Sequence, residues 1–295
     1  MTRPAWLPLA AAMIAATMGG TTAVATRMAV AGADPTTVAG LRYGIAAVML
    51  LAIARPLGAR PWRIARGDVV PLLVLGLSQF ALFGWLFTQG LAWITAARGA
   101  LILATMPLLT LLLAAAMGRE RLSAVKLAGV VLGAAGVAVA LGDRAGAVHP
   151  EAWKGDLMLM GGALICSIYN VFAPPYLRRY GSLSVTVFGM ICGTAAFGAL
   201  LGATGSIAGI AAIDARSWWA IAWLAVFGGA GNFLLWLWAL ERIPPTSVAI
   251  TVTLNPLSAA LLGAAVLDEA AGPGLIAGLV LVTLSILLVV RRDAR

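Results

Sequence analysis

Long apolar stretches without charges alternate along the chain with short segments that carry the charges. Nine stretches lack Asp, Glu, Lys and Arg altogether, namely residues 5–26, 69–97, 99–118, 127–142, 157–177, 180–213, 217–240, 243–267 and 270–290. Residues 36–54 form a tenth, interrupted only by Arg42. Such stretches have the length of a membrane-spanning helix, about 20 residues. The pattern therefore predicts an all-α membrane protein with ten transmembrane helices.

The composition agrees with a chain whose main solvent is lipid. Of 295 residues, 62% are apolar and 11% are charged, and the mean hydropathy is +0.99, whereas soluble domains carry about 25% charged residues. These values exclude a water-soluble globular protein. The formal charge is +9, but Lys and Arg occur in ones and twos between apolar stretches, without a basic stripe. We therefore expect no nucleic-acid partner.

Side chains that bind metals or perform catalysis are scarce. Cys166 and Cys192 lie in apolar stretches without the spacing of a zinc site or a disulfide framework, and His149, the only histidine, lies between two stretches. The sequence thus predicts no metal and no cofactor. A membrane-embedded enzyme is the alternative from another class of protein. It would need a nucleophile with a base, or a set of metal ligands, at membrane depth, so we expect no enzymatic activity.

Positive charges are divided unequally between alternate connecting segments. If the N-terminus is cytoplasmic, 14 Lys and Arg lie in cytoplasmic segments and 5 in outer segments. Because cytoplasmic loops are enriched in Lys and Arg, this bias predicts that both termini are cytoplasmic. The alternative for residues 5–26 is a signal peptide cleaved near Ala23-Val24-Ala25, although the apolar core of a signal peptide is usually only about 7 to 15 residues long.

Two landmarks recur at one fixed offset. Pro107 lies 13 residues before Glu120, Pro256 lies 13 residues before Glu269, and both pairs are separated by 149 residues. The sequence therefore predicts two five-helix repeats, residues 1–145 and 146–295. An odd number of crossings inverts the second repeat relative to the first, and such inverted pairs are typical of transporters with a site between the halves. Duplication for stability alone is the alternative.

Several segments also resemble a known family. They are Met18-Gly19-Gly20-Thr21, Arg42, residues 104–109 with 118–122, Gly129 with Gly133 and Gly136, and residues 254–257 with Asp268-Glu269. Together they resemble the ten-helix EamA-type carriers of the drug/metabolite transporter superfamily, which include YddG-like amino-acid exporters. The resemblance implies a multi-pass protein of the bacterial inner membrane that exports amino acids, including aromatic ones.

Helical spacing combined with the repeat suggests which residues face the substrate. Gln79, Phe83 and Phe87 share one helix face, and the offset pairs Phe83 with Asn232 and Phe87 with Trp236. In the first and sixth helices the equivalent pairs are Met18 with Ser167 and Thr21 with Asn170. Polar groups on these faces are costly towards lipid, so they predict an apolar, aromatic cavity with a few uncharged polar groups. Packing is the alternative role for the aromatic residues.

Five further residues are candidates for substrate contact or gating. Arg42, the only charge at depth, either holds a substrate carboxylate or has a structural role. Pro107 and Pro256 each interrupt a spanning helix, which either provides bending for alternating access or leaves a static kink. Glu120 and Glu269 lie at equivalent ends of helices and are candidates to close opposite gates by pairing with cations.

The sequence therefore predicts a carrier that exports small organic solutes by alternating access. No Asp or Glu lies in the centre of a predicted helix. Since ion-coupled pumps keep ionisable groups at depth, we expect facilitated rather than ion-driven transport. A drug or other metabolite exporter is the nearest alternative, and a channel is another. The expected partners are a small-molecule substrate and the lipid bilayer, with no obligate protein partner.

Overall fold

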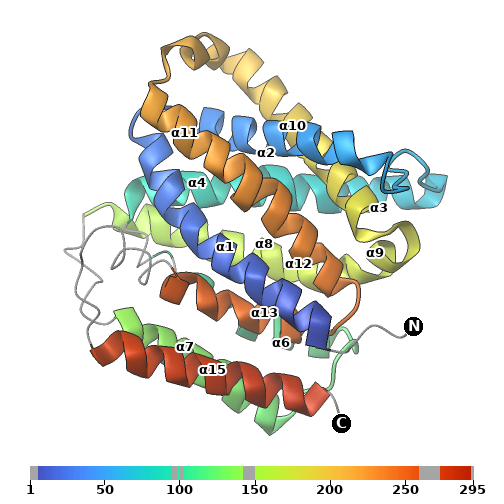
Figure 1. Ribbon diagram of the computed structural model, residues 1–295, viewed down its shortest axis with the longest axis vertical. Coiled ribbons are helices and arrows are strands. Elements are labelled where there is room, and N and C mark those ends of the chain that lie inside the picture. Colours follow the sequence, from blue (N-terminus) through green and yellow to red (C-terminus); the bar gives the residue numbers. More distant parts are fainter. Residues whose placement is uncertain (1–5, 95–98, 100–101, 142–149, 259–272, 294–295) are drawn as a thin grey trace.

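A computed structural model describes residues 6–94, 99, 102–141, 150–258 and 273–293 (Figure 1). Within these ranges the chain is almost entirely helical and contains no strand. Six helices are long and apolar enough to cross a membrane, and three shorter apolar helices accompany them. The prediction of an all-α membrane protein is confirmed.

Four of the six long helical spans lie before residue 181. They are α1 (Trp6–Val30), α2 (Pro35–Ala54), the continuous helix α3 (Arg66–Gly76), η1 (Leu77–Leu82) and α4 (Phe83–Trp93), and α8 (Ala152–Phe172). The other two are α10 (Ser182–Thr204) and the continuous helix α11 (Ala215–Trp223), η4 (Leu224–Gly231) and α12 (Asn232–Leu240).

Shorter helices complete the described chain. They are α6 (Met106–Ala116), α7 (Ala124–Leu141), α9 (Pro174–Tyr180), α13 (Pro245–Ala249), α15 (Pro273–Asp293) and the 3-10 segments η3 (Ser206–Ala212) and η5 (Ile250–Thr253). Local sequence sets several boundaries. Asp34 accepts a hydrogen bond from the Thr37 amide at 2.9 Å and Pro35 follows it, which is a favoured helix start. Gly205, with φ of +71°, ends α10.

The helices pack in pairs that relate the two parts of the chain. The closest packed pairs are α7 with α15, α2 with α10, α4 with α8, and α1 with α12 (Figure 1). Adding the offset of 149 residues carries most of α2 onto α10 and α7 onto α15. The same offset carries α4 onto α12 and most of α1 onto α8. The pair of α4 with α8 therefore corresponds to the pair of α12 with α1.

Both long composite helices contain a π-helical segment at equivalent positions. The segment η1 ends at Leu82 and η4 ends at Gly231, which are also 149 residues apart. A π turn places five rather than four residues in each hydrogen-bonded turn, and such turns are frequent at functional sites. In this chain η1 contributes Gln79 to the lining of the central cavity, and the lining residue Asn232 directly follows η4.

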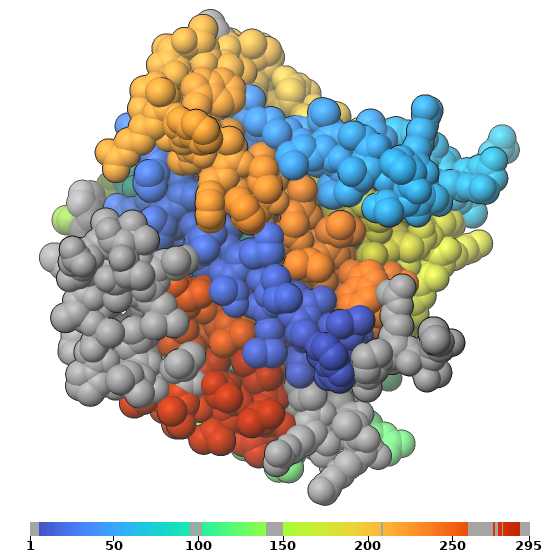
Figure 2. All heavy atoms as spheres, in the orientation of Figure 1, coloured from blue at the N-terminus to red at the C-terminus, as the bar shows by residue number. Residues whose placement is uncertain are grey.

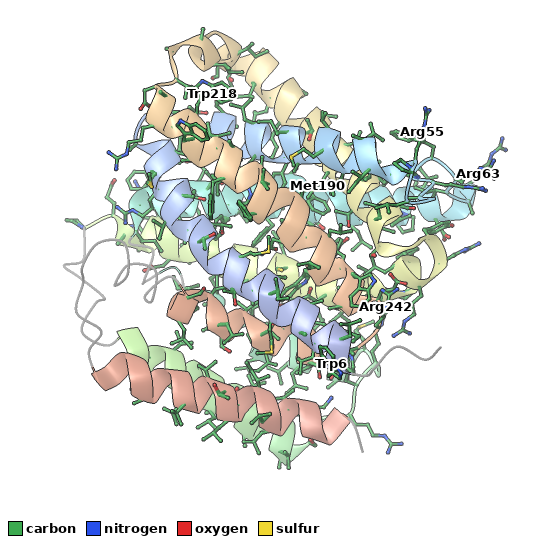
Figure 3. All side chains as sticks on the ribbon, in the orientation of Figure 1. Trp6, Arg55, Arg63, Met190, Trp218 and Arg242 are labelled. Atoms are coloured by element: carbon green, nitrogen blue, oxygen red, sulfur yellow. The ribbon has the colours of Figure 1, made fainter. Side chains whose placement is uncertain are left out.

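The surface is that of a protein surrounded by lipid. Many large apolar side chains are exposed, among them Val48, Val70 and Leu157, and Trp6 and Trp219 are 64% and 79% exposed. On one face of the molecule, α1 lies between α11–α12 and α15 (Figure 2). Arg55, Arg63 and Arg242 project from one end of the bundle, whereas Trp218 lies at the other end (Figure 3).

Candidate substrate cavity

A cavity lies in the middle of the helix bundle. The space within it that is available to the centre of a water-sized sphere amounts to about 100 Å³. Its wall is formed by α1, α2, η1, α4, α6, α8, α12 and η5, so residues from both predicted repeats contribute. The arrangement of these helices around the centre can be followed in Figure 1.

Six of the residues singled out from the sequence line this cavity. They are Gln79, Phe83, Phe87, Asn232, Trp236 and Arg42. The rings of Phe83 and Phe87 lie 5.8 Å apart between centroids. The wall is thus apolar and aromatic with a few polar groups.

The other four predicted contact residues do not line the cavity. Met18 packs against η4, since its Cε lies 2.6 Å from the position of a Cβ on Gly231. Thr21 accepts a hydrogen bond from Trp223 Nε1 at 3.0 Å. Ser167 is buried and donates to the carbonyl of Ala163 at 2.7 Å. On α1 it is instead Gly19, Gly20, Thr22 and Ala23 that face the cavity.

Asn170, the fourth of these residues, lies behind the wall. It is fully buried, and its Oδ1 accepts a hydrogen bond from Trp236 Nε1 at 3.0 Å. Because a buried indole N–H needs a partner, Asn170 fixes the orientation of the Trp236 ring at the cavity. Its role is therefore to position a lining residue.

Arg42 is a buried cation in the cavity wall. The residue is 5% exposed, and its Nη2 donates a hydrogen bond to the carbonyl of Gly228 in η4 at 2.6 Å. The guanidinium carbon lies 5.8 Å from the ring centroid of Phe87 and 5.1 Å from that of Tyr43, distances at which a cation is attracted to an aromatic face. Among the described lining residues, Arg42 is the only charged one.

Asn255 is a lining residue that the sequence pattern supplied only as a landmark of the repeat. Its amide packs on Gly19, where an added Cβ would lie 2.9 Å from Nδ2 and 3.1 Å from Oδ1. The same Cβ would lie 3.2 Å from the amide of Asn232, whose Nδ2 donates to the carbonyl of Ala15 at 2.7 Å. The absence of a side chain at Gly19 therefore lets two amides approach α1 at the cavity.

Cys166 also lines the cavity, although its apolar surroundings in the sequence suggest only an inert thiol. Its Sγ lies 3.9 Å from Gln79 Nε2, which donates to it. Phe233 lines the wall beside Asn232. Spacing by three and four residues selects a narrow face of each helix, and it misses such neighbours because the cavity is wider than one face.

The predicted helix breaks fall beside the cavity. Ala104 and Thr105 form a turn, and Pro107 occupies the second position of α6, where its missing N–H costs no helical bond. Pro256 is the third residue of a helical stretch that begins directly after the 3-10 segment η5. Met106 and Asn255, the residues before the two prolines, both line the cavity.

Glu120 is bound at one end of the bundle. Its Oε2 lies 2.7 Å from Lys126 Nζ, and both side chains are less than a tenth exposed. Its Oε1 accepts from the backbone amide of Thr246 at 2.9 Å, which joins the first part of the chain to the second. The neighbouring Arg119 donates to the carbonyl of Val171 and stacks over the Phe172 ring at 4.8 Å. Glu269 lies outside the described residues.

A second cluster of contacts joins the two parts of the chain at the same end. Asp68 pairs with Arg179 at 2.6 Å and also accepts a hydrogen bond from the Tyr180 hydroxyl. The hydroxyl in turn accepts from the amide of Ala65 at 3.2 Å. The hydrogen bond to Asp68 raises the pKa of Tyr180 above its ordinary value.

The described residues offer no site for a metal ion. Across the parts of the chain that the structure describes, there is no group of three or more His, Cys, Asp and Glu side chains that could hold one. The lining described above offers a cation, amides and aromatic rings to a bound molecule.

Comparison with known proteins identifies relatives along the whole chain. A probable terminal-alkyne amino-acid exporter of Streptantibioticus cattleyicolor is 28% identical over 267 residues, covering 88% of this chain and 86% of the relative. The aromatic amino acid exporter YddG of Ancylobacter novellus is 30% identical over 164 residues, covering 55% of this chain and 53% of the relative. An uncharacterized transporter of Archaeoglobus fulgidus is 25% identical over 288 residues, covering 97% and 99%.

A solved structure and a family model agree with these relatives. A crystal structure of a protein that is 21% identical shares the fold, with a TM-score of 0.79 and coverage of 98% of both chains. The model of the EamA-like transporter family matches residues 6–142 and again residues 153–291. The resemblance inferred from sequence motifs is therefore confirmed: the chain is a membrane protein that belongs to the EamA-like transporter family.

Proposed function

We propose that this chain exports amino acids, including aromatic ones, by alternating access through the central cavity. The observation that carries the proposal is the cavity wall, in which aromatic and uncharged polar side chains surround one buried cation, Arg42, among the described residues. A small amphipathic solute suits such a wall, whereas a phosphate or a sugar nucleotide calls for several buried cations. Two relatives named as amino-acid exporters support the same substrate class.

The machinery of this transport consists, we propose, of two inverted five-helix repeats, residues 1–145 and 146–295. Three observations support this organisation. The family model matches the chain twice, the packed helix pairs map onto one another under the 149-residue offset, and the π segments η1 and η4 end at equivalent residues. An inverted repeat provides two equivalent ways to close the bundle, one at each membrane face.

The conformation described above is closed, in this proposal, at the cytoplasmic face of the inner membrane, where both termini lie. This assignment is supported by the excess of Lys and Arg in the segments at that end. Contacts of Glu120 with Thr246, of Arg119 with Val171 and of Asp68 with Arg179 connect the two halves there. Breaking these contacts and forming their counterparts at the outer face would expose the cavity to the cytoplasm.

Transport is not coupled to protons or sodium in this proposal. No Asp or Glu is among the described residues that line the cavity, and ion-driven carriers depend on such groups at depth. The substrate then moves down its own gradient. Accumulation of an amino acid against its gradient in proteoliposomes, driven by an imposed proton gradient, would contradict this part of the proposal.

Counterflow in proteoliposomes tests the function directly. Vesicles loaded with unlabelled phenylalanine should transiently accumulate labelled phenylalanine and show saturation, because a carrier exchanges solute across the membrane. Flux that does not saturate would instead indicate a channel. Exchange of other metabolites or drugs without exchange of any amino acid would support the nearest alternative.

Variants of the wall connect this activity to the cavity. Trp236→Ala and Asn232→Ala should each reduce counterflow, because both residues line the cavity. Trp219→Ala is the matched control, since this side chain is 79% exposed at the surface. If the two cavity variants remain folded and transport as well as the wild type, the cavity is not the path of the substrate.

A further inference from the structure

Among the described residues that line the cavity, three hydrogen-bonding atoms are buried and have no hydrogen-bond partner. They are Arg42 Nε, Gln79 Oε1 and Asn255 Oδ1. Arg42 and Gln79 are 5% and 2% exposed, respectively. Buried polar groups nearly always have partners, because leaving a hydrogen bond unmade is costly. Because they belong to residues of the cavity wall, small movements of these side chains suffice to bring them to a bound molecule.

The three atoms differ in the chemistry that they demand. Arg42 supplies a positively charged donor. Its described hydrogen bond runs from Nη2 to the Gly228 carbonyl, so Nε has no partner among the described residues. Gln79 Oε1 and Asn255 Oδ1 are amide carbonyl oxygens, which only accept. A carboxylate complements the first group and an ammonium complements the other two.

The helix α1 gives the spacing between the cation and one of the acceptors. A Cβ added to Gly228 would lie 2.6 Å from Cγ2 of Thr22 and 3.2 Å from Arg42 Nη2, which places the guanidinium beside Thr22. The amide of Asn255 lies beside Gly19. Because Gly19 and Thr22 are three residues apart on one helix, the helix positions beside which the two groups lie are offset by about 4.5 Å along its axis.

This offset suits the head of an α-amino acid. Its carboxylate and its ammonium are attached to the same carbon atom, and each reaches a partner through a hydrogen bond of about 3 Å. A simple anion would leave the amide oxygens unpaired, and a simple cation would be repelled by Arg42. Both halves of the zwitterion are needed to complete the wall.

We propose that the cavity recognises the zwitterionic head of a free amino acid. Arg42 binds the carboxylate, and the carbonyl oxygens of Gln79 and Asn255 bind the ammonium, while the substrate side chain packs against Phe83 and Trp236. The identity of the cavity as a substrate site rests on the proposed function; the pairing of charges is additional. This pairing makes the two charges of the head group, rather than the side chain of the substrate, the main determinant of binding.

Equilibrium binding to purified protein tests this pairing with three probes that share one aromatic group. They are phenylalanine, N-acetylphenylalanine, which lacks the ammonium, and phenethylamine, which lacks the carboxylate. The wild type should bind phenylalanine at least about tenfold more tightly than either of the others, since each charged hydrogen bond contributes that much or more. Equal binding of phenylalanine and phenethylamine would overturn the role of Arg42 without any need for a variant.

Variants assign each charge to its partner. Arg42→Gln should remove the preference for phenylalanine over phenethylamine and keep the preference over N-acetylphenylalanine. The double variant Gln79→Leu with Asn255→Leu should do the reverse. Matched controls are Arg27→Gln, whose arginine bonds to the Ile94 carbonyl, and Gln89→Leu, whose glutamine bonds to Thr36; neither lines the cavity. If the cavity variants lose all three probes equally, the proposed pairing is wrong.

Two outcomes separate this inference from the function on which it rests. If phenylalanine undergoes counterflow but the probe preferences do not follow the variants, the pairing is wrong and the export function stands. If no amino acid binds or undergoes counterflow in wild-type protein with a normal gel-filtration profile, both fail. Arg42→Lys, which keeps the charge, provides a second folded variant and should retain the preference over phenethylamine.

Discussion

Asn170 and Trp236 form a pair across the contact of α8 with α12, and the pair determines how one wall of the cavity is shaped. The sequence placed Trp236 on a cavity face because helical spacing from Asn232 fixes it there. Helical spacing did not distinguish a residue that faces the cavity from one that supports it, so Asn170 was expected to touch the substrate. The distinction depends on which helix lies opposite, and that is a property of the assembled bundle.

Removing the acceptor of this pair should destabilise the protein. Asn170→Ala leaves Trp236 Nε1 buried without a partner, which costs about 1–3 kcal/mol. Trp236→Phe in the Asn170→Ala background removes the orphaned donor. A double-mutant cycle, measured by thermal unfolding in detergent, should therefore give a coupling of roughly 1 kcal/mol. Additive effects of the two substitutions would contradict the pairing.

Tyr180 gives a residue-scale prediction about pH. The hydrogen bond that its hydroxyl donates to Asp68 raises its pKa above the ordinary value of 10.0. A raised pKa in the folded state means that the bond stabilises the fold fully below the ordinary value and that this contribution is lost as pH rises through the raised value. The difference in ultraviolet absorbance between wild type and Tyr180→Phe should therefore show a tyrosinate that appears only above pH 10. In an Asp68→Asn variant this titration should move to lower pH.

At the scale of helices, glycine determines how closely two elements approach. A Cβ on Gly193 of α10 would lie 2.7 Å from Cβ of Phe80 and 2.8 Å from its backbone carbon in η1. Gly198 and Gly202 on the same helix have the same four-residue spacing as Gly189 and Gly193, yet an added Cβ there would meet nothing within 4 Å. The sequence predicted the helix and contains both glycine pairs, but it could not say which pair faces a neighbouring helix and which faces lipid.

This contrast predicts opposite effects of the same substitution on one helix. Gly193→Ala should destabilise the protein by about 1–3 kcal/mol, because the backbone of η1 cannot move away as a flexible side chain would. Gly198→Ala should be neutral or stabilising by up to about 1 kcal/mol, because alanine favours the helix and meets no neighbour. Thermal unfolding of the two variants in the same detergent measures the difference. Equal destabilisation would mean that α10 does not pack on η1 through Gly193.

For the whole molecule, the described contacts between the two halves include a set of charged side chains at one end. The fixed offset in the sequence predicts which helices correspond, and the proposed repeats use that correspondence. The sequence also placed Lys126 near Glu120. It could not supply the Thr246 amide as the second partner, because residues 120 and 246 meet only once the two halves are assembled.

Cys166 provides a native reporter for the opening of that end. It lines the cavity and is 8% exposed. The second cysteine is removed from the parent protein by Cys192→Ser, so that Cys166 is the thiol that the reagent reports. Glu120→Gln breaks a buried ion pair, which destabilises the closed arrangement by several kcal/mol. A membrane-impermeant thiol reagent applied from the cytoplasmic face should therefore label Cys166 faster in this variant than in the parent. Glu151→Gln, in an exposed pair with Lys154, is the control and should leave the rate unchanged.

The lone charge of Arg42 in the described cavity wall has an energetic consequence for the cell. A zwitterion adds no net charge to the carrier, so exchange of phenylalanine in both directions is electroneutral and should keep the same rate when the membrane voltage is clamped with potassium and valinomycin. A lysine substrate adds one elementary charge, which Arg42 repels. Moving that charge across the membrane also changes its energy by about 2.3 kcal/mol per 100 mV of membrane voltage. Neutral amino acids would thus leave the cell at a rate set by their own concentrations, independent of how strongly the membrane is energised.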